Sequence, residues 1–247
     1  MKAQNKLALV LHGYPRPVSE TSRLITLMKQ AGYDVVAPWY LKECREFSVP
    51  EVKKLVREKL KYKKPDLIIG LSLGGMLLPH IARDYPKAKV VFLGTGPMLS
   101  GRIKWMDNLV KLAAGRVGET AVKTLARLPE KVLKQGYMAV HKIRREKTDS
   151  ENYIHETEQT VKFFREINVQ KHLQTARFIK RCNNCALLQK LPNKTLIISG
   201  KNDVLMPPEL GRLIQKLVKH SRLVLTSGTH YQLMDGTAYN ELSRWLG

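Results

Sequence analysis

Short apolar runs recur along the chain and are separated by stretches in which apolar residues return with a helical period. Runs of this length, apolar throughout rather than alternating with polar residues, are typical of strands buried on both faces of a parallel sheet. We predict strands over residues 6–11, 34–38, 67–70, 89–93, 194–199 and 222–226. We predict helices between and after them over residues 19–31 (with Ser19 as cap), 51–62, 208–219 and 236–246, with a further helix after residue 72 that kinks or restarts near Pro79.

A long central stretch, residues 98–191, contains no convincing strand pattern. It predicts helices over residues 103–112, 120–128, 130–145, 152–167 and 169–189. Strand and helix alternation interrupted late by helices predicts a doubly wound, mainly parallel six-stranded α/β sheet with a helical insertion. We therefore expect a core formed by residues 1–97 and 192–247 and a helical cap formed by residues 98–191, with the pocket between them.

Gly70-Leu71-Ser72-Leu73-Gly74 follows the third apolar run directly and precedes a helical segment. A sharp turn between strand and helix would raise the Ser72 hydroxyl above the sheet edge, and glycine at both flanks would prevent collisions with the strand and the helix. A glycine-rich turn with an incidental serine is the alternative interpretation of this motif alone.

A base and an acid follow at later strand ends. Asp203 comes after the fifth predicted strand and His230 after the sixth. Carboxyl ends of parallel strands share one edge of a sheet, so both residues are expected near Ser72. A serine hydroxyl needs a neighbouring base to become nucleophilic, and that base needs a carboxylate to fix its tautomer.

With these residues in this order, the chain resembles the α/β-hydrolase superfamily through His12-Gly13, the Ser72 motif, Gly200-x-x-Asp203 and Gly228-x-His230. The resemblance implies Ser72 as nucleophile, His230 as general base and acid, and Asp203 as its orienting acid. It also implies an oxyanion hole formed by the main-chain N–H groups of Tyr14 and Leu73. The chain departs from the family pattern by lacking the leading hairpin and by a compact loop after the acid.

The expected function is hydrolysis of a small-molecule carboxylic ester or thioester through an acyl-enzyme on Ser72. The alternatives are a non-catalytic ligand-binding protein of the same fold, a C–C bond hydrolase and a cofactor-free haloperoxidase.

The candidates for lining the substrate pocket are Tyr14, Trp39 and Met98, and ordinary apolar packing of these side chains is an equal interpretation. We expect His12 to support its loop and Asp235 to cap the last helix.

The formal net charge is +22 and the basic excess is spread along the chain rather than gathered in one segment. Such a charge favours anionic partners in general. Because no nucleic-acid motif and no stacking pattern of aromatic residues accompanies it, we expect a solvated basic surface, no specific nucleic-acid partner and at most weak association with anionic surfaces.

Three cysteines, Cys44, Cys182 and Cys185, do not make a disulfide framework. Cys182-x-x-Cys185 has no second pair and no histidine at a spacing typical of zinc modules, so we expect neither a metal nor a cofactor. The first apolar run is too short for a signal-peptide core or a membrane span, and a cytoplasmic location is expected.

Overall fold

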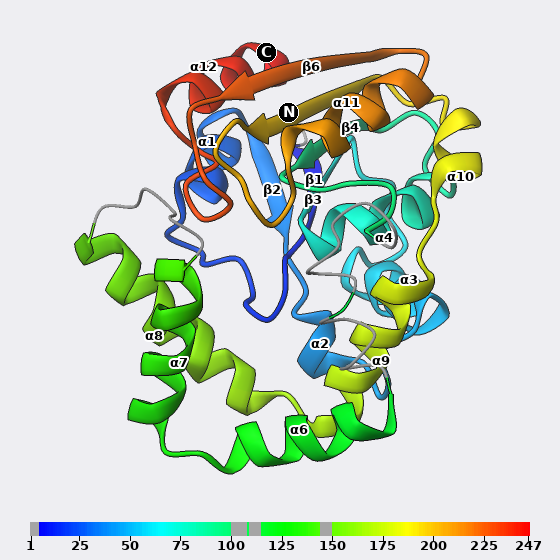
Figure 1. Ribbon diagram of the computed structural model, residues 1–247. Coiled ribbons are helices and arrows are strands. Elements are labelled where there is room, and N and C mark those ends of the chain that lie inside the picture. Colours follow the sequence, from blue (N-terminus) through cyan, green and yellow to red (C-terminus); the bar gives the residue numbers. More distant parts are fainter. Residues whose placement is uncertain (1–4, 100–107, 109–114, 144–149) are drawn as a thin grey trace.

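The computed structural model describes residues 5–99, 108, 115–143 and 150–247. Six parallel strands form one sheet in the order β2-β1-β3-β4-β5-β6 (Figure 1). Their bounds are β1 Lys6–Leu11, β2 Tyr33–Val36, β3 Leu67–Leu71, β4 Lys89–Leu93, β5 Thr195–Gly200 and β6 Ser221–Thr226. The predicted doubly wound parallel sheet is confirmed, and each strand bound lies within two residues of its prediction.

Both faces of the sheet are covered, which is why its strands are apolar throughout. Successive side chains of a strand point to opposite faces. Ala8 and Val10 of β1 pack with α1 (Arg23–Gln30) and α12 (Gly236–Leu246), whereas Leu9 and Leu11 pack with the helices of the other face. Those helices are α3 (Val49–Lys59), α4 (Leu73–Ala82) and α11 (Pro208–Leu217).

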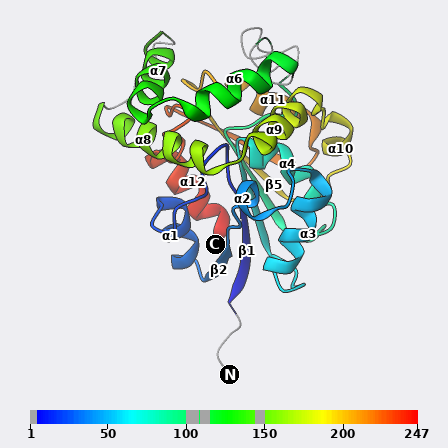
Figure 2. The same ribbon diagram turned by 90° about the horizontal axis from the view of Figure 1, so that it is seen from below.

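The helices between β4 and β5 gather beyond the carboxyl ends of the strands, away from the N-terminus (Figure 2). Their bounds are α6 Arg116–Arg127, α7 Glu130–Ile143, α8 Ser150–Glu166, α9 Val169–Arg181 and α10 Cys185–Gln189. Helix α6 packs against α9, and α7 packs against α8. The predicted helix over 103–112 falls outside the described residues except for Asn108. The division into core and cap stays a prediction.

The single helix predicted over 169–189 is wrong, because the chain breaks between α9 and α10. Asn184 stands at the break, where its main-chain N–H donates to the Pro97 carbonyl at 2.9 Å and its side-chain amide donates to the Met76 carbonyl at 2.7 Å. These two bonds fasten the end of the insertion to the core. Periodicity could not reveal them, since both partners are distant in sequence.

Other helix predictions differ in detail; the helix predicted over 120–128, for example, is α6 and starts four residues earlier, at Arg116. Helix α1 is capped by Ser22, whose Oγ accepts from Ile25 N–H, and not by Ser19. Helix α3 starts after Ser48 and ends at Lys59, because Lys61 and Tyr62 adopt left-handed backbone conformations. Helix α4 continues through Pro79. A short helix, α2 (Tyr40–Glu43), was not predicted.

Among the described helices, none combines the length and apolar composition that a membrane span requires.

Candidate active site

Ser72 occupies the turn between β3 and α4 in a strained conformation, with φ 49° and ψ −112°. Glycine is required on both sides of it. A Cβ on Gly70 would lie 2.7 Å from the Gly74 carbonyl oxygen, and one on Gly74 would lie 2.1 Å from the Leu11 carbonyl oxygen. Because Ser72 N–H donates to the Leu93 carbonyl at 3.0 Å, the turn is also tied to the neighbouring strand β4.

Asp203 lies in the turn after β5, and its side chain is buried, with the residue 2% exposed. Its Oδ1 accepts hydrogen bonds from the main-chain N–H groups of Leu205 and Met206, at 2.9 and 2.7 Å. A buried carboxylate needs such donors, and here they fix its orientation. The other oxygen, Oδ2, is left to face the loop after β6.

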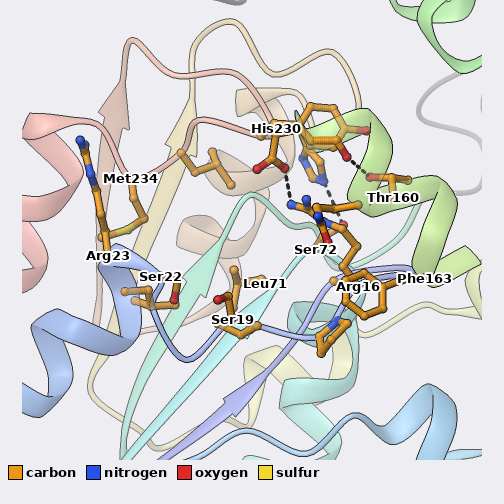
Figure 3. A pocket seen from close by; sticks show the side chains of 18 of the residues that line it. Arg16, Ser19, Ser22, Arg23, Leu71, Ser72, Thr160, Phe163, His230 and Met234 are labelled. Atoms are coloured by element: carbon orange, nitrogen blue, oxygen red, sulfur yellow. Dashed lines mark hydrogen bonds and ion pairs between the residues drawn. The ribbon is translucent and has the colours of Figure 1, made fainter. Parts of the chain in front are cut away.

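His230 lies in that loop, and its ring makes hydrogen bonds to both Asp203 and Ser72. Its Nδ1 is 2.8 Å from Asp203 Oδ2 and its Nε2 is 3.1 Å from Ser72 Oγ. A carboxylate only accepts hydrogen bonds, so Nδ1 carries the hydrogen and Nε2 presents a lone pair to the serine hydroxyl. Three side chains from three strand ends therefore form one continuous hydrogen-bonded chain, and Figure 3 shows Ser72 and His230 among the residues that line a cavity.

The loop after β1 and the start of α4 both lie beside Ser72. The main-chain N–H of Leu73 is the first in α4 and has no acceptor within the helix. On the other side, a Cβ on Gly13 would lie 3.3 Å from Ser72 Cβ, so the loop after β1 passes close to the serine and places Tyr14 next in the chain.

His12 supports this loop through a hydrogen bond and through ring stacking. Its Nδ1–H donates to the Gly13 carbonyl, and its ring stacks on Tyr40 with centroids 3.8 Å apart. The Tyr40 hydroxyl donates to the His12 carbonyl. Burial lowers the pKa of His12 to about 4, which keeps the imidazole neutral near pH 7. His12 thus supports the loop through these contacts, and the imidazole that lies beside Ser72 Oγ is that of His230.

A cavity of about 680 Å³ opens at Ser72 and His230. Its walls come from the loop after β1, the start of α1, the loop after His230 and one face of α8. In Figure 3, Arg16 and Phe163 stand on one side and Arg23 and Met234 on the other. The cavity is large enough for a small organic substrate.

Of the three residues considered for the substrate pocket, only Tyr14 lines this cavity. Trp39 lies behind the wall, where its ring packs edge-on against Phe163 at 5.1 Å between centroids. Met98 lies beside Cys185, with 4.0 Å between the sulfur atoms. Proximity in sequence to a site loop did not place these two side chains in the cavity.

Sequence reasoning missed the contribution of the helical insertion. His155, Glu156, Gln159, Thr160 and Phe163 all line the cavity from α8. The only signal was their spacing of three to four residues, which puts these side chains on one helix face. That spacing does not say which face turns toward Ser72.

Among the described residues, no group of three or more histidine, cysteine or acidic side chains could hold a metal ion. Cys44, Cys182 and Cys185 are free thiols. Cys182 ends α9, with its Sγ 3.7 Å from the Pro97 carbonyl oxygen, and burial raises its pKa to about 12. The thiol is therefore protonated and packs as a small apolar group.

Comparison with known proteins defines the family. A family model described as the alpha/beta hydrolase fold matches residues 37–237, most of the chain. The chain belongs to the α/β-hydrolase family. No curated protein sequence matches it.

Solved α/β-hydrolase structures resemble the chain over nearly its full length. An esterase from Exiguobacterium antarcticum has a TM-score of 0.69 at 16% identity, covering 98% of this chain and 91% of its own. A bromoperoxidase from Bacillus anthracis has a TM-score of 0.66 at 19% identity, covering 98% and 91%. A thermophilic esterase from Thermogutta terrifontis has a TM-score of 0.68 at 17% identity, covering 98% and 89%. At these identities the likeness concerns the fold.

Proposed function

We propose that the protein is a serine hydrolase that cleaves a carboxylic ester or thioester through an acyl-enzyme on Ser72. The observation that carries the proposal is the unbroken hydrogen-bonded chain from Ser72 Oγ through His230 to Asp203, which opens onto a cavity. A nucleophile, a base and an orienting acid within hydrogen-bond reach of one another are what acyl transfer needs.

In the acylation half, Ser72 Oγ attacks the carbonyl carbon of the substrate while its proton passes to His230 Nε2. Asp203 holds the ring in the required tautomer and stabilises the imidazolium that forms. The carbonyl oxygen becomes an oxyanion, which accepts hydrogen bonds from the main-chain N–H groups of Leu73 and Tyr14. Collapse of this intermediate breaks the bond to the leaving group, which takes the proton from His230 and departs as an alcohol or thiol.

In the deacylation half, His230 Nε2 takes a proton from water while the water oxygen attacks the acyl carbon. A second oxyanion forms in the same hole. Its collapse breaks the bond to Ser72 Oγ, which recovers the proton from His230, and the carboxylic acid leaves. The serine is regenerated, so no further reactant besides water is needed.

A bromoperoxidase among the structural neighbours favours one second candidate, a cofactor-free haloperoxidase reaction at the same Ser72. The C–C bond hydrolase and the non-catalytic binder have no such observation in their favour. Bromination of a dione substrate with hydrogen peroxide and bromide, measured beside ester hydrolysis, separates the two reactions. Ester hydrolysis without bromination supports the hydrolase.

The test uses p-nitrophenyl esters of graded chain length with stopped-flow detection. We expect at least one ester to give a burst of p-nitrophenol equal to one equivalent of enzyme whenever deacylation is the slower step. Ser72→Ala abolishes both burst and turnover. Ser221→Ala is the matched control, because Ser221 starts β6 at the far end of the sheet and should leave both unchanged. Equal hydrolysis by Ser72→Ala and the wild type would refute the proposal.

A further inference from the structure

A hydrogen bond joins the loop after β1 to the helical insertion. The hydroxyl of Tyr14 lies 2.6 Å from Nδ1 of His172, a residue of the first turn of α9. The two residues are 158 positions apart in sequence. This bond therefore connects the proposed oxyanion-hole loop to an element outside the sheet.

The direction of this bond follows from the other side of the ring. His172 Nε2 is 3.0 Å from the Phe164 carbonyl oxygen, which only accepts, so Nε2 carries the hydrogen. Burial lowers the pKa of His172 to about 4, so the ring is neutral near pH 7 and Nδ1 presents a lone pair. The Tyr14 hydroxyl must then be the donor.

The His172 side chain is buried and held on several sides, whereas Tyr14 is partly exposed. His172 is 4% exposed and stacks on the Phe164 ring with centroids 4.2 Å apart. Tyr14 is 39% exposed, and its ring meets the His172 ring edge-on with centroids 5.8 Å apart. Its hydroxyl adds a hydrogen bond to the same histidine, so His172 restrains the side chain in both ways. Two residues later, Arg16 pairs with Glu156 of α8, so a second contact ties the same loop to the insertion.

The backbone of Tyr14 connects this anchor to the chemistry. A trans peptide is planar, so the Gly13 carbonyl and the Tyr14 N–H point in opposite directions. His12 holds the Gly13 carbonyl on one side of the loop, which turns the Tyr14 N–H to the other. Gly13 has no side chain to restrain the rotation of the peptide that follows it. The Tyr14 side chain is therefore a second restraint on that N–H group, beside the His12 hydrogen bond.

We propose that His172 is a positioning residue for the oxyanion hole, acting through the Tyr14 hydroxyl to aim the Tyr14 N–H at the substrate oxygen. This inference rests on the proposed function and adds a role for the helical insertion. Because an oxyanion hole acts on the transition state, loss of the bond should lower kcat and leave KM nearly unchanged.

A matched pair of variants separates positioning from packing. His172→Asn places an amide oxygen near the position of Nδ1 and keeps an acceptor for Tyr14. His172→Gln places an amide nitrogen near the position of Nε2, so it keeps the donor to Phe164 but loses the acceptor. Both remove the ring that stacks on Phe164. We expect His172→Gln to lose about tenfold or more in kcat and His172→Asn to stay within about threefold of wild type.

Tyr14→Phe removes only the hydroxyl and should match His172→Gln, with no further loss in the double variant. Binding of a trifluoromethyl ketone, which mimics the tetrahedral intermediate, should weaken by the same factor as kcat/KM. Thr175→Val is the control, because it removes a buried hydroxyl one turn along α9 that donates to the Lys171 carbonyl and not to Tyr14. It should leave kcat unchanged.

Covalent labelling of Ser72 by a fluorophosphonate separates failure of this inference from failure of the proposed function. Wild type that neither labels nor hydrolyses any ester refutes both. Wild type that labels, together with Tyr14→Phe and His172→Gln that turn over at the wild-type rate, overturns the positioning role alone. Equal losses of kcat in the Asn and Gln variants would also overturn it, because packing would then account for both.

Discussion

The hydroxyl of Thr95 donates a hydrogen bond of 2.7 Å to the main-chain carbonyl of Ser72. Thr95 follows β4 and is 2% exposed, and a Cβ on Gly75 would lie 2.4 Å from its methyl carbon. Since φ is positive at Ser72, the turn persists only while its surroundings hold it. Thr95 is thus one of the groups that hold the serine in its strained conformation.

Replacing Thr95 by valine should therefore weaken both the fold and the site. Valine matches threonine in shape but cannot donate, so we expect a loss of about 1–2 kcal/mol in the free energy of unfolding. We also expect a fall in kcat, because Ser72 is less firmly placed. Thr95→Ser keeps the donor and should retain kcat. Urea unfolding and steady-state kinetics measure both effects, and a valine variant with wild-type kcat would contradict this role.

Two glycines of the chain should respond in opposite ways to alanine. Gly74→Ala places a Cβ 2.1 Å from the Leu11 carbonyl oxygen, so strand β1 or helix α4 must move and stability should fall by several kcal/mol. Gly136 lies within α7, and no atom of the neighbouring described residues lies within 4 Å of its Cβ position. Gly136→Ala should raise stability by about 0.5–1 kcal/mol.

Thermal unfolding of the two variants side by side provides the measurement. A tolerated Gly74→Ala would mean that the approach of α4 to β1 at the turn is looser than the structure shows. A destabilised Gly136→Ala would mean that α7 meets a further neighbour at that position.

Much of the sheet could be predicted from the sequence, because buried strands such as Leu67–Leu71 need apolar residues on both faces. The motif around Ser72 was also informative, because a side chain at Gly70 would collide with the backbone of α4 and one at Gly74 with the backbone of β1. The N-cap role of Asp235, whose Oδ1 accepts from Ala238 N–H at 2.9 Å, was also predicted correctly.

The insertion could not be predicted to the same depth. Which face of α8 turns toward Ser72 depends on how α7 and α8 pack, and a helical period leaves that choice open. The break at Asn184 and the Tyr14–His172 bond each join residues more than 80 positions apart, so no local pattern reports them. The same limit explains why Trp39 and Met98 were considered for a cavity that they do not line.

The stability of the protein should fall as the pH is lowered from 7 to 5. Burial depresses the folded-state pKa of both His12 and His172 from 6.5 to about 4. Between these values the unfolded chain binds protons that the folded chain does not, so acid favours unfolding. Each imidazole should contribute a loss of about 2 kcal/mol over this interval.

Urea unfolding at a series of pH values measures this effect. His172→Asn removes one of the two titrating rings and should reduce the loss by about half. A free energy of unfolding that stays constant from pH 7 to 5 would show that neither histidine is held neutral.

Asp203→Asn should lower kcat by roughly 10²–10⁴-fold while the protein stays folded. An amide can donate to His230 Nδ1, which favours the tautomer with hydrogen on Nε2, and that nitrogen then cannot accept the proton of Ser72. Asp235→Asn is the matched control, because Asp235 caps α12 and should change stability more than rate. Equal kcat for Asp203→Asn and wild type would remove Asp203 from the mechanism.

The account depends most on Ser72 being an activated nucleophile. Incubation with a fluorophosphonate, followed by peptide mapping by mass spectrometry, tests this directly, because the reagent phosphonylates a serine only where a base has activated it. We expect one adduct, located on Ser72, and no adduct in Ser72→Ala or after denaturation. Wild-type protein that stays unlabelled, or that labels at another residue, would contradict the central claim.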